Sequence, residues 1–466
     1  MKNILGKFKD KRILILGFGE EGISTYRIIK EEFPFQNLAV ADLKEKNKFE
    51  QSILQDIEKD KNTTFIFGKD YLSKIDNYDV IIKSPGISPT KIVDHIGGDK
   101  TFITQTEIFF EECQGKIIGV TGTKGKTTTS TLIYEILKKA GLKCYLVGNI
   151  GQPALEVLKK HNDKDSLYIY ELSSHQLAGL KFSPHISIIL NIGTDHLDWH
   201  GSQEEYVKAK ENILMHHKVD DIAILNHDDK IVRELANLTK AKSLFFSLED
   251  KKCEAFFDGD LLRVKLPSQD ELTIDPRKIL LRGKHNWLNI LAASIAAKEL
   301  GVENKVITDL IYSFKGLEHR LEPVAKIKGV TFINDSISTN PTSLQAAINS
   351  FLEPITLIMG GFDRGLDYQD LAKEIVINKQ VKRVIIIGEV GPKMIRSLNK
   401  AGFRGSIINL KQKPMAKIVG NAFRNTPRGG VVLLSPAAAS FDMFKDYKDR
   451  GNQFKKAIQA LSNEQK

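Results

Sequence analysis

The sequence predicts an α/β protein of three domains, each built on a largely parallel sheet. Short runs of aliphatic and β-branched residues alternate with helical segments along the chain, the pattern of strands joined by crossover helices. Two of the buried strands run into glycine-rich turns and then into helices, at residues 17–22 and 122–127. The 466 residues fit about three domains of roughly 150 residues each. We predict domains at residues 1–111, 112–316 and 317–466.

The N-terminal segment opens with a buried strand over residues 12–17, which leads into the first glycine-rich turn and a helix. A second strand brings Asp42 about 20 residues further on, as in the dinucleotide-binding (Rossmann) fingerprint. Glu20 and Glu21, however, stand where a pyrophosphate would approach. The pattern therefore predicts a Rossmann-like domain more strongly than it predicts a dinucleotide cofactor, and a nicotinamide-dependent dehydrogenase stays an alternative.

Two further strands, TTFIFG and YDVIIKSPGI, continue this first sheet. The turn Ser84-Pro85-Gly86 follows the second of them, at the carboxyl edge where open α/β sheets bind ligands. Such a turn is also common without a ligand, and its spacing alone favours an ordinary turn.

The central segment carries the most informative motif, GVTGTKGKTTT at residues 119–129. A buried strand, a glycine-rich turn and a helix opened by threonines form the layout of a phosphate-binding loop (P-loop), where backbone N–H groups and the helix N-terminus bind phosphates. Lys126 would reach the β- and γ-phosphates, and the Thr127 hydroxyl would bind Mg²⁺. Val120 replaces the first glycine of the strict pattern. We predict a nucleoside triphosphate site; a plain strand-to-helix turn with solvated lysines is the alternative.

Polar residues also end two neighbouring strands of this segment. Glu171 ends the strand SLYIYE, and a carboxylate there is what Mg²⁺ at a P-loop needs as a second protein anchor. Asp195 and His196 follow the strand ISIILN, which we expect to lie parallel to the loop strand, so that a role for His196 in the site is plausible. On the next helix, the pattern alone predicts that Lys208 and Lys210 are solvated.

The end of the central segment has a different pattern from its beginning. Residues 220–275 alternate short strands with charged turns, and we expect them to form a satellite rather than a site. Residues 281–300 then give a glycine turn and a small-residue helix that is apolar nearly all round and must be buried. Asn286 and Asn289 share one face of it, where they could bind an adenine edge or cap the helix.

The third segment predicts a second Rossmann-like, doubly wound sheet. Its strands are GVTFIND, PITLIMGG, VKRVIIIG, SIINL and GGVVLLSP, with helices between most of them. Polar residues follow several strand ends: Asp335, Asn340, Arg364 and the stretch 435–440.

Composition excludes several other classes. The net charge of +10 comes from scattered lysines rather than from a basic run with interleaved aromatics, so we expect no nucleic-acid partner. No run of about 18 apolar residues or signal peptide is present, so we expect no membrane insertion. The three cysteines, odd in number and widely spaced, indicate neither a disulfide framework nor a metal knuckle. We expect a cytoplasmic protein, and a monomer.

Taken together, the motifs resemble those of the Mur ligase family in the same order, and they cover all three segments. The matching stretches are GTKGKTTT, YELSSHQL, NIGTDHLDWHGS, YVKAKENI, GKHNWLNILAA, GLEHRLEPV, NDSISTN, GGFDRG and LLSPAAASFDMFKDYKDRGNQF. Other members carry Asp, then a tyrosine or glycine, then a histidine or asparagine shortly before a proline. The form of residues 335–340 and the stretch 440–447 are instead similar to the members that add D-glutamate.

The resemblance implies a reaction in peptidoglycan precursor synthesis. ATP phosphorylates the terminal carboxylate of UDP-N-acetylmuramoyl-L-alanine, the amine of D-glutamate attacks the acyl phosphate, and phosphate leaves. The protein itself forms no covalent bond to the substrates in this reaction. The rate therefore depends on how the protein positions the substrates and neutralises their charge. Two Mg²⁺ ions are implied as cofactors.

The resemblance also implies the roles of individual residues. Lys126, Thr127 and Glu171 hold the triphosphate and one Mg²⁺. His196 binds a second Mg²⁺, supported by Lys210 once CO₂ has carbamylated it. The further ATP contacts implied are Gly122, Thr123, Lys124, Gly125, Thr128, Asn286, Asn289, Arg320 and Asp335. The implied contacts to the UDP substrate are Gly19, Glu20, Glu21, Asp42, Leu43, Ser84, Gly86, Asn149 and Ser173, and those to D-glutamate are Thr339, Arg364, Ser440 and Tyr447.

The sequence departs from the family pattern at three positions. Ile337 stands where many relatives have lysine, Arg364 stands where some have lysine, and His175 replaces the usual aromatic after Ser-Ser. An arginine can still grip a carboxylate bidentately. The first two changes leave open a ligase for another acid, such as an L-glutamate-adding variant or one like folylpolyglutamate synthase. Outside the family, the alternatives are the dehydrogenase and a nucleotide-switched binding protein without chemistry.

Overall fold

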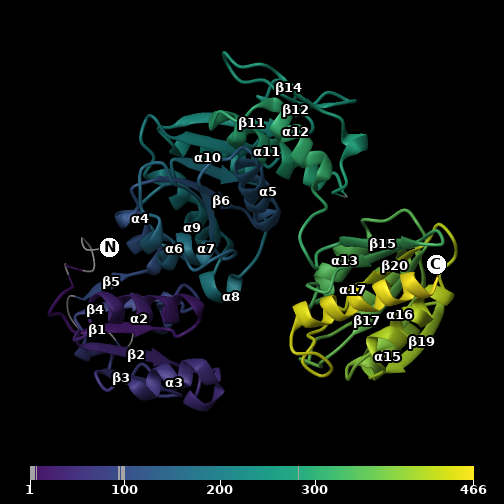
Figure 1. Ribbon diagram of the computed structural model, residues 1–466, viewed down its shortest axis with the longest axis horizontal. Helices are drawn as coiled ribbons and strands as arrows, with labels where there is room; N and C mark the ends of the chain where they lie inside the picture. The colour runs from purple at the N-terminus through teal and green to yellow at the C-terminus, as the bar shows by residue number, and fades with distance from the viewer. Residues whose placement is uncertain (1–5, 7, 93–94, 96–99, 282, 466) are drawn as a thin grey trace. The chain divides into compact units, whose positions relative to one another are not determined.

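The computed structural model describes residues 6, 8–92, 95, 100–281 and 283–465, and it is an α/β protein with three sheets (Figure 1). The predicted class is confirmed. The chain divides into two compact units, Met1–Ile279 with Lys284–Tyr312, and Leu280–Gly283 with Ser313–Lys466. The first unit contains two of the sheets and the second unit contains one. The exact domain boundaries given above stay predictions.

The first sheet has five parallel strands in the order β3-β2-β1-β4-β5. This is the Rossmann-like start that the sequence predicts. Helix α2 packs closely on the turn that follows β1. A Cβ at Gly22 of this helix would lie 2.0 Å from the Gly17 carbonyl oxygen, so only glycine fits there. The elements are β1 (Ile13–Leu16), α2 (Glu20–Glu32), β2 (Leu38–Asp42), α3 (Gln51–Lys59), β3 (Thr63–Phe67), β4 (Val80–Lys83), β5 (Thr101–Ile103) and α4 (Gln105–Glu112).

The second sheet has nine strands in the order β14-β13-β12-β11-β10-β9-β6-β8-β7. Its strands from β7 to β12 pair in parallel, and β13 and β14 add an antiparallel edge. The strands are β6 (Lys116–Thr121), β7 (Cys144–Gly148), β8 (Leu167–Glu171), β9 (Ile186–Ile189), β10 (Ile222–Asn226), β11 (Lys242–Ser247), β12 (Ala255–Phe257), β13 (Leu262–Val264) and β14 (Leu272–Ile274). Residues 220–275 therefore extend the central sheet and are not a separate satellite, because Ile222 pairs directly with Ile186 of β9.

The predicted buried helix of the central segment is α11 (His285–Glu299), whose alanine-rich surface packs against α5 (Lys126–Lys139) and β10. The other helices of this region are α6 (Ala154–Lys160), α7 (Ser174–Leu177), α8 (Leu197–His200), α9 (Gln203–Met215), α10 (Lys230–Leu235) and α12 (Asn304–Ser313). Among the described residues, no helix combines the length and the apolar composition needed to cross a membrane.

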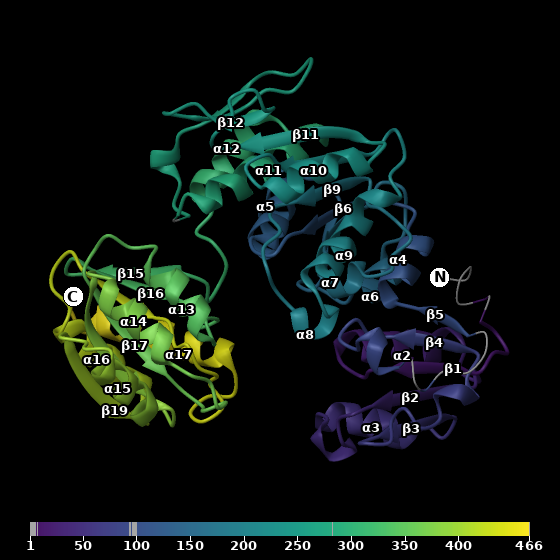
Figure 2. The same cartoon turned by 180° about the vertical axis from the view of Figure 1, so that it is seen from behind.

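The second unit is doubly wound, as predicted, with the strand order β15-β16-β20-β17-β18-β19. Strand β15 runs antiparallel to β16, and the other neighbouring strands pair in parallel. One apolar cluster lies under α13, α14 and α15, and a second lies under α16 and α17, so helices cover both faces (Figure 2). The elements are β15 (Glu322–Ile327), β16 (Val330–Asn334), α13 (Pro341–Ile348), β17 (Ile355–Gly360), α14 (Gln369–Ile377), β18 (Val381–Ile387), α15 (Gly391–Lys400), β19 (Ser406–Lys411), α16 (Met415–Arg424), β20 (Val431–Leu434) and α17 (Tyr447–Glu464).

Candidate active site

The predicted P-loop motif has the expected strand, turn and helix. Strand β6 ends at Thr121, and α5 begins at Lys126 with Gly125 as its N-cap in the left-handed region (φ 89°). A Cβ at Gly125 would lie 2.5 Å from Asn289 Oδ1, so both the backbone conformation and the space require glycine. The Lys126 ammonium folds back over the loop and donates hydrogen bonds to the carbonyls of Gly122 (2.8 Å) and Thr123 (3.0 Å).

A cavity of about 330 Å³ adjoins this loop within the first unit. Most of its wall comes from residues that follow the carboxyl ends of parallel strands, the edge where open α/β sheets bind ligands. The lining residues are Pro85, Gly86, Lys126, Asn149, Ser173, Ser174, His175, Asp195, His196, Tyr206 and Lys210. The cavity thus brings together residues that the sequence singled out from six different stretches of the chain.

The two strand-end residues of the central sheet lie where their strands predict. Glu171 is buried at the end of β8, and it pairs in register with Val120, the last but one residue of β6. His196 follows β9, which runs parallel to β6 as predicted. The backbone of His196 is in the left-handed region (φ 51°), which is uncommon for a residue other than glycine. The Nε2 atom of His196 lies 3.6 Å from Asp195 Oδ2.

The prediction of two solvated lysines on α9 is correct for Lys208 and wrong for Lys210. Lys208 is exposed and pairs with Glu205 at 2.7 Å. Lys210 is buried, and its Nζ donates to Thr121 Oγ1 and to the Gly122 carbonyl, both at 3.1 Å. Burial, with the positive charge of Lys126, lowers the pKa of Lys210 to about 7, against the opposing effect of Asp195. The buried amine therefore titrates near neutral pH.

Two further residues of the cavity were not predicted as site residues. Tyr206 lies one turn before Lys210 on α9, and its hydroxyl is 2.9 Å from Thr123 Oγ1; the i, i+4 spacing to Lys210 was the available signal. The ring of His175 lies 4.7 Å from the ring of His196 and stacks on His200. Burial and the neighbouring His196 and His200 lower the pKa of His175 to about 4, so this histidine is neutral at pH 7.

The predicted asparagine pair lies against the P-loop. Asn289 donates to Asn286 Oδ1 at 2.9 Å, both residues are buried, and Asn289 Oδ1 approaches Gly125 as described above. The N-cap of α11 is Lys284, which makes no side-chain capping bond. Neither asparagine therefore occupies the N-cap position of α11.

The residues predicted at the N-terminal sheet divide into two groups. Asp42 accepts hydrogen bonds from the backbone N–H groups of Phe18 (2.6 Å) and Lys44 (2.7 Å), and Ser84 donates to the Gly17 carbonyl, so these side chains converge on the first glycine-rich turn. Gly19, Glu20, Leu43 and Gly86 are exposed around it. Glu21 instead accepts a hydrogen bond from Gln176 of α7 at 2.8 Å, and burial raises the pKa of its carboxyl.

In the second unit, Asp335 directly follows β16 and is buried. It accepts hydrogen bonds from Ser435 (2.7 Å) and from the Leu321 N–H (3.1 Å), while burial raises its pKa to about 6. Arg364 is exposed, with its guanidinium over the ring of Phe441 at 5.5 Å. Thr339 is half-buried before α13, Ser440 is buried, and Tyr447 begins α17.

A residue that the sequence did not single out holds these loops together. Arg450 is fully buried and donates to the Ser336 hydroxyl (3.0 Å), the Ser336 carbonyl (2.9 Å) and the carbonyls of Ala438 (3.1 Å) and Ala439 (3.3 Å). It thus joins the loop after β16 to the loop after β20, which contain Thr339 and Ser440, two of the predicted amino-acid contacts. The only signal was its place in the conspicuous stretch KDYKDRGNQF.

Comparison with known proteins decides the family. The protein-family model of the Mur ligase middle domain matches residues 120–297. The protein-family model of the Mur ligase glutamate ligase domain matches residues 319–438. A UDP-N-acetylmuramoylalanine--D-glutamate ligase from Acetivibrio thermocellus is 36% identical over 98% of this chain and 97% of its own length. This chain belongs to the Mur ligase family. A ligase of the same name from Streptococcus mutans is 35% identical over 98% of this chain and 99% of its own length.

Solved structures show the same Mur ligase fold. The UDP-N-acetylmuramate-alanine ligase of Thermotoga maritima superposes with a TM-score of 0.58 at 19% identity, over 97% of this chain and 100% of the other. The MurF ligase of Thermotoga maritima in complex with ADP gives a TM-score of 0.55 at 17% identity, over 97% and 96% of the two chains. These likenesses extend the Mur ligase architecture over nearly the full length.

Proposed function

We propose that this Mur ligase adds D-glutamate to UDP-N-acetylmuramoyl-L-alanine, forming an amide bond as ATP is converted to ADP and phosphate, in peptidoglycan precursor synthesis. The observation that carries the proposal is the cavity in which the P-loop lysine Lys126 meets His196, Lys210, Asn149 and Ser173. The full-length similarity to D-glutamate ligases supports the choice of amino acid. We further propose that the protein acts as a cytoplasmic monomer.

We assign one substrate to each predicted domain. Residues 1–111 bind the uridine diphosphate end through the turn on which Asp42 and Ser84 converge. Residues 112–316 bind ATP through the P-loop and through the asparagine pair packed on Gly125. Residues 317–466 bind D-glutamate through Thr339, Arg364, Ser440 and Tyr447, and Arg320 and Asp335 contribute ATP contacts.

The reaction is an acyl transfer in two steps. A carboxylate oxygen of the substrate attacks the γ-phosphorus, a P–O bond to ADP breaks, and an acyl phosphate forms. The amine of D-glutamate then attacks the acyl carbon, and after loss of a proton from nitrogen the tetrahedral intermediate expels phosphate. Lys126 holds the transferring phosphoryl group, and Asn149 and Ser173 orient the muramoyl substrate, so that the protein contributes mainly position and charge.

The donor set of the site suits Mg²⁺. Thr127 and the buried Glu171 offer oxygen ligands for one ion, and His196 with a carbamylated Lys210 offers a second position. Bound Mg²⁺ would neutralise the negative charge of the phosphates and of the acyl oxygen. The buried position of Lys210 supports carbamylation: its amine nitrogen attacks CO₂ and loses a proton, and the resulting carbamate replaces a repelling cation with oxygen donors.

A phosphate-release assay tests the function directly. With ATP and UDP-N-acetylmuramoyl-L-alanine, we expect sustained phosphate release only when D-glutamate is added, and little with L-glutamate. Equal rates with L-glutamate would favour the variant ligase, and release independent of any amino acid would favour a simple nucleotide hydrolase. Reduction of NAD by a hydroxy acid would instead identify the dehydrogenase.

Replacing Asp42 with asparagine or alanine is expected to weaken binding of the UDP substrate about tenfold or more, because a charged hydrogen-bond acceptor at the first glycine-rich turn is lost. The affinity for ATP should stay unchanged. Titration calorimetry with each ligand measures both, and Asp56→Ala, an exposed carboxylate of α3, is the matched control. Measurable binding of NAD to the wild-type protein would contradict the assignment.

Replacing Arg364 with alanine is expected to raise the KM for D-glutamate by about 10- to 100-fold, which corresponds to the roughly 1.5–3 kcal/mol of a lost charged hydrogen bond. The KM for ATP should change little. Steady-state kinetics with each substrate varied measures the effect, and Arg396→Ala, an exposed arginine on α15, serves as the control. An unchanged KM for D-glutamate would remove Arg364 from the site.

A further inference from the structure

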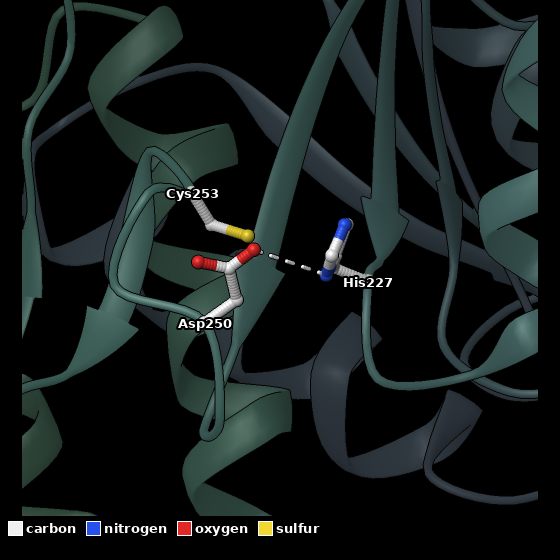
Figure 3. A group of neighbouring side chains, drawn as sticks. All are labelled: His227, Asp250 and Cys253. Atoms are coloured by element: carbon white, nitrogen blue, oxygen red, sulfur yellow. Dashed lines mark ion pairs between the residues drawn. The ribbon is translucent and has the colours of Figure 1, made fainter.

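Away from the cavity, three side chains that commonly bind metals meet at the carboxyl ends of β10 and β11. His227 directly follows β10, and Asp250 and Cys253 lie on the turn between β11 and β12. One ligand atom from each of the three lies within 4.8 Å of the other two. Figure 3 shows the thiol, the carboxylate and the imidazole turned toward one another from these two segments. None of the three is among the residues that line the cavity.

The backbone holds this cluster in place. The His227 N–H donates to the Phe246 carbonyl at 2.9 Å, which fixes the end of β10 against β11. The Ser247 hydroxyl donates to Asp228 and accepts the N–H of Asp250 at 2.7 Å. The Cys253 N–H donates to the Asp250 carbonyl. The segments that carry the three ligands are therefore already positioned by the fold.

The charges around the thiol favour a cation. His227 Nδ1 lies 3.7 Å from Asp250 Oδ2, and the carboxylates of Asp228 and Glu254 also act on Cys253. His227 and Asp250 are each about one-third exposed, which leaves a route for an ion from solvent.

We propose that His227, Asp250 and Cys253 bind one Zn²⁺ ion, with water as the fourth ligand. An imidazole nitrogen, a thiolate sulfur and a carboxylate oxygen are donors that this borderline-soft ion accepts. With metal–ligand bonds of about 2.0–2.3 Å, tetrahedral donors lie roughly 3.3–3.8 Å apart. The distance between His227 Nδ1 and Asp250 Oδ2 falls in this range. Because the ligand atoms of all three residues lie within 4.8 Å of one another, small side-chain movements would bring them to bonding distance.

Binding exchanges one proton for the metal: the S–H bond of Cys253 breaks, the sulfur electron pair binds Zn²⁺, and the proton passes to solvent. The bound ion would join the end of β10 to the β11–β12 turn, next to the antiparallel edge of the sheet. Mg²⁺ does not compete at a thiolate site, because this hard cation requires oxygen ligands. The site is therefore distinct from the proposed Mg²⁺ positions of the ligase.

Cobalt substitution provides the test, since a thiolate bound to Co²⁺ gives a sulfur-to-metal charge-transfer band in the near ultraviolet. The full-length protein is stripped of metal with a chelator and titrated with Co²⁺ in excess Mg²⁺. We expect the band to saturate at one Co²⁺ per chain and to disappear when Zn²⁺ is added. Cys253→Ser should abolish it, whereas Cys144→Ser, which alters a half-buried thiol on β7, should leave it intact.

Two other variants keep the test decisive if Cys253→Ser does not fold. Asp250→Asn and His227→Asn alter partly exposed side chains, and each should weaken Co²⁺ binding by at least about tenfold. Zn²⁺ should also raise the melting temperature of the wild-type protein and not that of Asp250→Asn. Absence of the band in the wild-type protein, or its survival in Cys253→Ser, would overturn the proposal. So would an affinity for Co²⁺ that is unchanged in both Asp250→Asn and His227→Asn. None of these readouts depends on ligase activity.

Discussion

Replacing Lys210 with alanine is expected to abolish most ligase activity, by about 100-fold or more, in a protein that still folds and binds ATP. In the structure the amine of Lys210 is buried and hydrogen-bonded to Thr121 and Gly122 of the P-loop motif. An unmodified ammonium in that position would repel Mg²⁺, whereas a carbamate supplies oxygen donors. Turnover measured with and without added acetate checks the role, because a small carboxylate should partly restore activity by filling the vacated space.

The matched control for this variant lies two positions away on the same helix. Lys208→Ala removes an exposed lysine paired with Glu205 and should leave turnover unchanged. Lys210→Arg should be inactive and should not respond to acetate, since the guanidinium keeps the charge and occupies the space. Near-normal turnover of Lys210→Ala would show that the buried lysine has only a structural role.

Replacing Arg450 with alanine is expected to loosen the two loops that carry Thr339 and Ser440, two of the proposed D-glutamate contacts. The change removes four hydrogen bonds and takes the guanidinium away from the buried carbonyls of Ser336 and Ala438, at a cost of about 3 kcal/mol or more. Amide hydrogen exchange of the full-length protein should therefore quicken about 100-fold in peptides covering residues 336–340 and 435–440. The KM for D-glutamate should also rise in Arg450→Ala.

Arg450→Lys should not restore protection, because a single ammonium cannot reach acceptors on both loops at once. Arg424→Ala, which alters an exposed arginine of α16, should leave exchange in these peptides unchanged. Wild-type exchange in Arg450→Ala would mean that the loops are held by other contacts.

The parts of the site that could be predicted from the sequence are those carried by local pattern. The strand, turn and helix of the P-loop motif, and the position of Glu171 at the end of a neighbouring strand, follow from runs of apolar residues and the glycines between them. The strands after residue 220 were recognised, yet their membership in the central sheet depends on pairing with β9, which no local pattern reports.

The misjudged residues depend on contacts that are distant in sequence. Lys208 and Lys210 look alike on a helix, and contacts with Thr121 and Gly122, 89 and 88 residues away, make Lys210 a buried donor. Arg450 likewise has its acceptor Ser336 at a separation of 114 residues. In each case the chemistry is set by the packing of separate elements.

Transfer of an oxygen isotope tests the proposed reaction most directly. The L-alanine carboxylate of the UDP substrate is labelled with ¹⁸O, and the phosphate released during ligation with D-glutamate is examined by mass spectrometry. An acyl phosphate mechanism predicts one ¹⁸O atom in each released phosphate, because the attacking carboxylate oxygen leaves with the phosphoryl group. Phosphate that carries no label, alongside formation of the amide product, would contradict an acyl phosphate and with it the account of the site given above.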